Sequence, residues 1–191
     1  MKGIWNKITT LFFIFALFGL NSCEKDDNAK EWGNAKIYMP QAAMLDKGLS
    51  HDYPVPLKVT KNYGIDSTTN LLHVYLGVYR SGLQPLQSYS VQIYVDAAAT
   101  NDALSGIDEG VALPSDVYSL PDEAVVPDNE RETGFDLIVD LNKLTEKYIS
   151  YATKKIVLVV GISNPSKYVL NEALCKTTVI IDGAFFLPAL Q

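Results

Sequence analysis

Apolar and polar side chains alternate along the stretch LLHVYLGVYR at positions 71–80, and this alternation decides the fold class. The even-numbered residues from Leu72 to Val78 are aliphatic, whereas His73, Tyr75 and Tyr79 occupy odd positions. Because successive side chains of a β-strand point to opposite faces of a sheet, the two sets lie on different faces. The stretch therefore predicts a strand with an aliphatic core side and an aromatic outer side.

The same period of two recurs in both directions along the chain, between clusters of Pro, Gly, Asn and Asp. Helix is expected at 142–152, where Leu144, Tyr148 and Tyr151 fall at helical spacing. Residues 97–104 form either a short helix or a loop, and Asn101 and Asp102 favour the loop. The pattern predicts an all-β protein, an antiparallel two-sheet sandwich of about seven to nine strands with one short helix. Strands are expected at 35–39, 55–61, 71–80, 90–96, 116–120, 124–126, 134–141, 155–162 and 175–182.

The composition is that of an ordinary globular domain. The chain has 191 residues, of which 48% are hydrophobic and 20% charged, which is enough apolar material for a substantial core. Two Cys and two His exclude a disulfide framework and a His/Cys metal cluster. A net charge of -6 argues against nucleic acid as a partner. Neither a cofactor nor a metal is expected.

The N-terminus is typical of a signal peptide. Lys2 and Lys7 precede an apolar run at 11–20, which is half the length of about twenty residues that a membrane-spanning helix needs. The four residues that follow, LNSC at 20–23, resemble a bacterial lipobox. That resemblance implies removal of residues 1–22 and acylation of Cys23 as the new N-terminus. The alternative is an ordinary secreted protein in which Cys23 is incidental.

The segment after Cys23 is polar, which predicts a lipidated tether over 23–34. Its Lys25, Asp26 and Asp27 resemble the export tag of Bacteroidetes-type surface lipoproteins, which implies a position on the outer face of the outer membrane. The alternative is a solvated charged spacer. Because the chain is acidic, the lipid alone is expected to hold it to the membrane.

Three short motifs resemble a known family over residues 35–182. They are IYMPQA at 37–42, LP at 113–114 followed by YSLP at 118–121, and YVLNE at 168–172. The chain resembles the domain of unknown function at the N-terminus of many Bacteroidetes-type surface lipoproteins. The resemblance implies one immunoglobulin-like sandwich over 35–191, of a kind that commonly precedes a glycoside-hydrolase or carbohydrate-binding domain. Since the sequence ends at Gln191, directly after this domain, glycan processing by the polypeptide is not expected.

Residues for catalysis are scarce, and the sequence predicts that the protein is not an enzyme. His51 and His73 have no Ser or Cys neighbours that suggest a triad. Cys175 is expected to be a buried, inert thiol. The carboxylates nominally available for glycoside hydrolysis lie in expected surface loops, where a solvated carboxylate is the default, and they lack the spacing of a calcium loop. They are Asp96, Asp102, Asp108, Glu109, Asp128, Glu130 and Glu132.

The tyrosine content is the remaining indication of a binding function, because the chain has eleven tyrosines. A tyrosine ring offers a flat apolar face to a sugar while its hydroxyl stays hydrated. His73, Tyr75 and Tyr79 share one strand face, and Tyr94 lies outward on the next strand, so these four are the candidate glycan-stacking residues if the two strands pair. The alternative is that the tyrosines pack under loops, pair across strands or make a corner hydrogen bond.

These features predict a cell-surface lipoprotein that acts as a non-catalytic accessory module in glycan binding or uptake. Its expected partners are the outer membrane, through the lipid, and a glycan. The alternative is a structural or adhesion protein that docks a protein partner. In that case the contact is an exposed sheet edge or the apolar tail AFFLP at 184–188.

Overall fold

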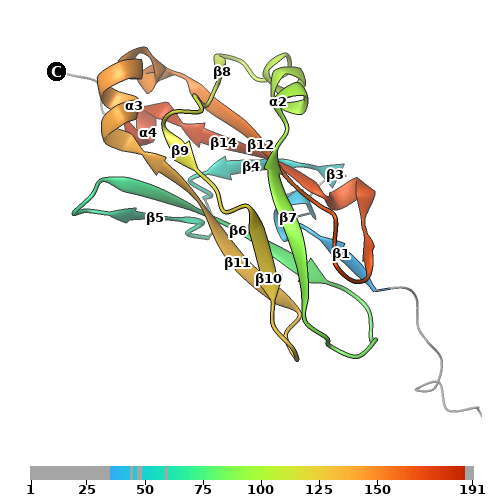
Figure 1. The fold of residues 1–191 in the computed structure, drawn as a ribbon. Coiled ribbons are helices and arrows are strands. Elements are labelled where there is room, and N and C mark those ends of the chain that lie inside the picture. The colour runs from blue at the N-terminus through green and yellow to red at the C-terminus, as the bar shows by residue number, and fades with distance from the viewer. Residues whose placement is uncertain (1–34, 44, 47–48, 59, 188–191) are drawn as a thin grey trace, which may run out of the picture. The chain divides into compact units, whose positions relative to one another are not determined.

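Two β-sheets pack face to face in the computed structural model (Figure 1). It describes residues 35–43, 45–46, 49–58 and 60–187. The signal peptide, Cys23 and the tether expected from the sequence lie outside these residues. Among the helices described, none is long and apolar enough to cross a membrane.

The first sheet is built around β6 (Leu71–Arg80), the strand that the alternating stretch predicts. Its order is β13-β1-β6-β11-β9, with β5 also paired to β6. The other strands of this sheet are β13 (Val169–Leu170), β1 (Lys36–Tyr38), β11 (Glu132–Asp140), β9 (Tyr118–Ser119) and β5 (Tyr63–Asp66).

The second sheet is built around β12 (Lys155–Ser163), and its order is β10-β7-β12-β14-β4, with β8 also paired to β12. Its other strands are β10 (Glu123–Val126), β7 (Tyr89–Val95), β14 (Lys176–Asp182), β4 (Asp52–Val55) and β8 (Gly110–Ala112). A separate pair consists of β2 (Leu45–Asp46) and β3 (Leu49–Ser50).

The strand order confirms the predicted immunoglobulin-like sandwich. The path β1-β6-β11-β9 matches strands A-B-E-D, and β7-β12-β14 matches strands C-F-G. The long ladders are antiparallel, as predicted. Three short pairs are parallel instead, namely β1 with β13, β12 with β8 and β14 with β4.

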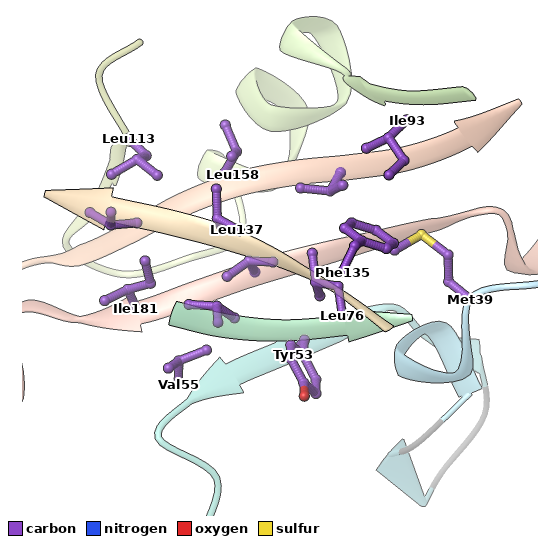
Figure 2. Packing of buried hydrophobic residues seen from close by; sticks show 14 of the residues in the cluster. Met39, Tyr53, Val55, Leu76, Ile93, Leu113, Phe135, Leu137, Leu158 and Ile181 are labelled. Carbon is purple, nitrogen blue, oxygen red and sulfur yellow. The ribbon is translucent and has the colours of Figure 1, made fainter. Parts of the chain in front are cut away.

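The core lies between the sheets and contains the aliphatic side of β6 (Figure 2). Leu76 of β6 and Phe135 and Leu137 of β11 face Leu158 and Ile181 of the second sheet. Burial of one such side chain contributes about 1.5 to 3 kcal/mol before the entropy of ordering the chain is subtracted. The period of two therefore sets which side of each long strand is buried.

Helix α2 (Ala97–Leu104) forms where the sequence favoured a loop. The Asp96 side chain caps it by accepting a hydrogen bond from the Ala99 N–H, and Asn101 and Asp102 are exposed. The helix covers β12, since the Thr100 hydroxyl accepts from the buried Val159 N–H. This cover explains why β12 is apolar on both faces. The expected helix at 142–152 is α3 (Leu141–Tyr148), followed by the 3₁₀ turn η3 (Ile149–Thr153).

The strand predicted at 55–61 is wrong. The chain there turns between β4 and β5, and the buried Asn62 holds the turn: its Nδ2 donates to the Pro54 carbonyl and its Oδ1 accepts from the Leu57 N–H, both at 2.9 Å. Proline at 54 and 56 removes ladder donors, so β4 is confined to a sheet edge. Short 3₁₀ turns complete the chain at η2 (Pro40–Ala43) and η4 (Glu172–Leu174).

The apolar tail packs onto the sandwich as far as it is described. Phe186 and Leu187, in and after α4 (Gly183–Phe186), are buried. The Phe186 ring meets Tyr63 edge-on, with centroids 5.1 Å apart, while Phe185 stays 55% exposed. Of the two adjacent phenylalanines, Phe186 therefore packs into the core, whereas Phe185 lies at the surface.

Candidate functional site

The outer face of β6 and β11 carries a repeating cross-strand pattern. Tyr75 stands opposite Asp136, Gly77 opposite Gly134, and Tyr79 opposite Glu132. A rung of two glycines therefore separates two rungs that each hold a tyrosine and an acid. Because glycine has no side chain, the sheet backbone forms the floor between them. We call these three rungs, together with His73 and Tyr38, the aromatic face.

His73 and Asp136 join the two strands at one end of the aromatic face. The His73 Nδ1 lies 2.9 Å from the Asp136 Oδ2. Both side chains are partly exposed, so an approaching ligand meets an imidazole and a carboxylate held together. Neighbouring Tyr75 is 44% exposed, and its hydroxyl end covers Gly64 of β5. A tyrosine laid over a cross-strand glycine presents a broad, fixed surface.

Tyr79 and Tyr38 form the other end of the aromatic face. They are directly paired between β6 and β1, and their ring centroids lie 5.4 Å apart at an interplanar angle of 53°. Burial raises the pKa of the Tyr38 phenol above its ordinary value of 10.0, and the nearby Tyr79 and Glu132 raise it further. Its hydroxyl is therefore protonated at neutral pH and available as a hydrogen-bond donor.

Tyr94 does not join this face. The four candidate residues were expected to form one patch only if their strands pair, but β6 and β7 belong to different sheets. Tyr94 stands opposite Gly161 of β12, and a Cβ placed on Gly161 would come within 2.6 Å of the Tyr94 ring. Its role there is to cover a glycine, which is the cross-strand alternative left open by the sequence. Burial raises the pKa of the Tyr94 phenol.

A hollow of about 300 Å³ lies on the second sheet close to α2. Beside it the Lys176 ammonium lies 2.6 Å from the Asp96 carboxylate. His51 also lines the hollow, and its Nδ1 lies 3.2 Å from the Lys176 carbonyl. The ion pair between Asp96 and Lys176 joins the start of α2 to the start of β14.

The carboxylates considered for glycoside hydrolysis have structural or solvent contacts. Asp96 caps α2, and its hydrogen bonds to the Ala99 N–H and Lys176 lower its pKa, whereas a general acid needs a raised one. Glu109 pairs with Lys154, and Asp128 accepts from the Ser88 N–H. The remaining four are exposed, namely Asp102, Asp108, Glu130 and Glu132. Within the described residues, no group of three or more His, Cys, Asp or Glu side chains is placed to hold a metal ion.

Cys175 is buried, as predicted, and its Sγ donates to the Glu172 carbonyl at 3.3 Å. Burial raises the pKa of the thiol, so it stays protonated at neutral pH.

The sequence missed part of the aromatic face. The alternation along 134–141 puts Asp136 on the outer side of its strand, but its contact with His73 depends on the register between β6 and β11. Tyr38 and the two glycines were not singled out. The alternation along both strands indicates which side chains point outward, but a period of two does not reveal which strands are neighbours.

No protein-family model matches the chain, and no curated protein matches its sequence. Solved structures do match. A Bacteroides ovatus protein of unknown function is 13% identical, with a TM-score of 0.53, over 78% of this chain and 46% of its own. A multidomain protein including DUF1735, from the same species, is 12% identical, with a TM-score of 0.51, over 78% of this chain and 45% of its own.

A proposed carbohydrate-binding protein from Bacteroides ovatus is also 12% identical, with a TM-score of 0.50. The match covers 76% of this chain and 36% of that one. This chain thus spans less than half the length of each of these three structures. At such low identity the likeness establishes a shared fold. It agrees coarsely with the surface-lipoprotein resemblance, and membership of that domain family stays a prediction.

Proposed function

We propose that the protein is a lipid-anchored outer-membrane protein that binds glycan at the cell surface without catalysing a reaction. One observation carries the glycan part of the proposal. On the aromatic face, Tyr75 and Tyr79 stand on either side of the floor formed by Gly77 and Gly134. This arrangement leaves the exposed Gly134 between two flat apolar rings.

The chemistry of the aromatic face suits a sugar. Tyrosine rings pack against the C–H faces of a pyranose, while their hydroxyls remain hydrated. The carboxylates of Asp136 and Glu132 accept hydrogen bonds from sugar hydroxyls, and they stand opposite the two tyrosines. An open, shallow face of this kind suits one side of an extended chain rather than an enclosed small molecule.

The non-catalytic part of the proposal rests on the carboxylates. Asp96 has a lowered pKa, and Glu109 is paired with a lysine. Hydrolysis of a glycoside calls for one carboxyl group with a raised pKa beside a second carboxylate. The match to a proposed carbohydrate-binding protein supports a sandwich of this type as a scaffold for binding.

The anchoring part of the proposal rests on the N-terminal sequence. The LNSC motif ending at Cys23 and the acidic segment after it resemble the lipobox and export tag of surface lipoproteins. Two or three acyl chains on one cysteine hold a protein firmly, because each buried methylene contributes about 0.8 kcal/mol.

A glycan microarray probed with the detergent-solubilised full chain tests the glycan part. We expect binding to at least one polysaccharide class, and a loss of tenfold or more in affinity for Tyr75→Ala and Tyr79→Ala. Tyr94→Ala, which removes the same side chain from the opposite sheet, is the matched control and should bind like the wild type. Absence of retention on every glycan would reject the proposal.

A further inference from the structure

One edge of β11 is left open. On the side away from β6, β11 pairs with β9 at only two positions, Ile138 and Val139. The paired part of β11 continues along β6 to Glu132. Across the described residues, positions 132–137 have no strand partner on the β9 side. A short neighbour therefore leaves more than half of this edge unpaired.

The backbone groups at this edge can be assigned from two hydrogen bonds. The Arg80 N–H donates to the Arg131 carbonyl, so the backbone of residue 131 points toward β6. The Asp140 N–H donates to the Val117 carbonyl, so residue 140 points to the other side. Because this direction alternates along a strand, the N–H and C=O groups of Glu132, Gly134 and Asp136 point to the open edge.

A hollow of about 570 Å³ lies along the open edge. It is lined from β11 by residues including Phe135 and Asp136, and from β10 by residues including Val125, which is 53% exposed. In Figure 1, β10 lies beside β11, although β10 pairs with β7 of the second sheet. The hollow thus runs between the edge strands of two sheets. We call it the edge groove.

The edge of β11 lacks three of the usual protections against strand addition, although it carries acidic side chains. Natural sheet edges are commonly blocked by lysine, by proline or by a bulge. The segment from Glu132 to Asp140 contains neither lysine nor proline, and its pairing with β6 is continuous. A partly apolar groove beside free backbone donors and acceptors is the geometry that accepts an additional strand.

The negative charge of the edge groove indicates which kind of segment can bind there. Among the described residues that line the edge groove, Glu123 and Asp136 are acidic and none is basic. Glu132 adds a third carboxylate at the end of the edge, and His73 is the titratable group that contacts Asp136. A second copy of this chain would bring the same carboxylates to the contact and be repelled. A basic segment is attracted instead.

We infer that the edge groove binds an extended segment of a partner protein in which basic and apolar residues alternate. The segment adds to β11 as a strand, its apolar side chains contact Val125 and its basic side chains meet the carboxylates. This inference does not rest on the glycan proposal. It shares Glu132, Gly134 and Asp136 with the aromatic face, but it uses their carboxylates and their backbone groups at the edge of β11 rather than the tyrosine rings of β6.

Fluorescence anisotropy with the full chain tests the inference. The probe is a labelled eight-residue peptide of alternating Lys and Val. We expect saturable binding that weakens tenfold or more when alternate amides of the peptide are N-methylated, since N-methylation keeps the charge and removes the strand donors. A peptide of alternating Glu and Val should not bind. Equal binding of the N-methylated peptide would overturn the inference.

Two substitutions locate the site. Val125→Lys places a cation in the edge groove and should weaken binding of the Lys–Val peptide tenfold or more. Val169→Lys is the matched control, because Val169 is 50% exposed on β13, at the other end of the first sheet. Hydrogen exchange should slow at the amides of Gly134 and Asp136 when the peptide binds. Unchanged exchange there, or equal weakening by both substitutions, would contradict strand addition to β11.

Discussion

The Arg80 guanidinium lies over the Tyr168 ring, with its central carbon 4.7 Å from the ring centroid. Arg80 is fully buried, and its Nη2 donates to the Gln84 carbonyl at 2.8 Å. Its Nε and Nη1 have no hydrogen-bond partner among the described residues. The aromatic ring therefore supplies much of the stabilisation that this buried cation receives, and it ties the end of β6 to the segment before β13.

Loss of the Tyr168 ring should destabilise the fold. The Tyr168 hydroxyl also donates to the Pro85 carbonyl at 2.9 Å and accepts from the Gln87 N–H at 3.1 Å. We expect Tyr168→Phe to cost about 1 kcal/mol in the free energy of unfolding, and Tyr168→Leu about 2 to 3 kcal/mol because the cation loses its ring as well. Urea denaturation measures both. Equal costs for the two variants would show that the ring contributes nothing.

Arg80→Met should change the free energy of unfolding by no more than about 1 kcal/mol in either direction. Methionine fills similar space, and the substitution removes a buried charge that has no carboxylate partner among the described residues. The same urea experiment applies. A loss of more than about 3 kcal/mol would mean that the charge itself is required for folding.

Gly183→Ala should be strongly destabilising. Gly183 stands where β14 leads into α4, and its N–H donates to the Lys154 carbonyl at 3.0 Å. A Cβ there would overlap the Tyr151 carbonyl oxygen and lie 2.8 Å from that of Lys154, so backbone would have to move. We expect a cost of about 3 kcal/mol. Gly106→Ala, where the nearest atom is 3.8 Å away, is the matched control and should be neutral or slightly stabilising.

Stability should fall with acid partly through Asp96. The hydrogen bond that the Asp96 carboxylate accepts from the Ala99 N–H lowers the pKa of Asp96 below the ordinary 3.8. The hydrogen bond from Lys176 lowers this pKa further. A carboxyl group with a lowered pKa contributes stability above its unfolded pKa and loses it as the pH falls through the folded value. Between about pH 5 and about pH 3, Asp96→Asn should therefore show a shallower loss of stability than the wild type. Asp102→Asn, exposed on the same helix, should keep the wild-type slope.

Membrane attachment should depend on Cys23 and not on Cys175. If the lipobox resemblance is correct, Cys23→Ser moves the protein from the membrane fraction to the soluble fraction. Cys175→Ser should remain in the membrane fraction, because Cys175 is a buried thiol of the sandwich. Cell fractionation gives the distribution, and mass spectrometry of the N-terminal peptide should show the added acyl chains. An unmodified Cys23 in the native protein would refute the anchor.

The sequence predicted the strands whose side chains alternate cleanly and failed where local signals conflicted. Residues 71–80 became the central strand of the first sheet, because a period of two fixes which side is buried. Residues 155–162 became the central strand of the second sheet without alternating, since α2 covers that strand. Val55 and Leu57 continue the same alternation, yet Asn62 and the two prolines turn the chain there. For α2, the capping signal of Asp96 was present but was outweighed by Asn101 and Asp102, which the helix simply exposes.

The alternation of one strand could be predicted from the sequence, whereas the assembly of the aromatic face could not. His73, Tyr75 and Tyr79 do share an outer face, as the alternation of β6 requires. The condition for grouping Tyr94 with them, that the two strands pair, is not met, because strands that are adjacent in the sequence can lie in opposite sheets of a sandwich. The glycine rung and the contact between His73 and Asp136 come from long-range register, which local pattern does not encode.

Mapping of backbone amide shifts by NMR, with the best ligand of the glycan microarray, is the most direct test of the aromatic face. The shifts should concentrate at residues 73–79 of β6 and 132–136 of β11, and Tyr75→Ala should abolish all of them. Shifts gathered around Tyr94 and Gly161 on the opposite sheet, or no shifts at saturating glycan, would contradict the glycan proposal.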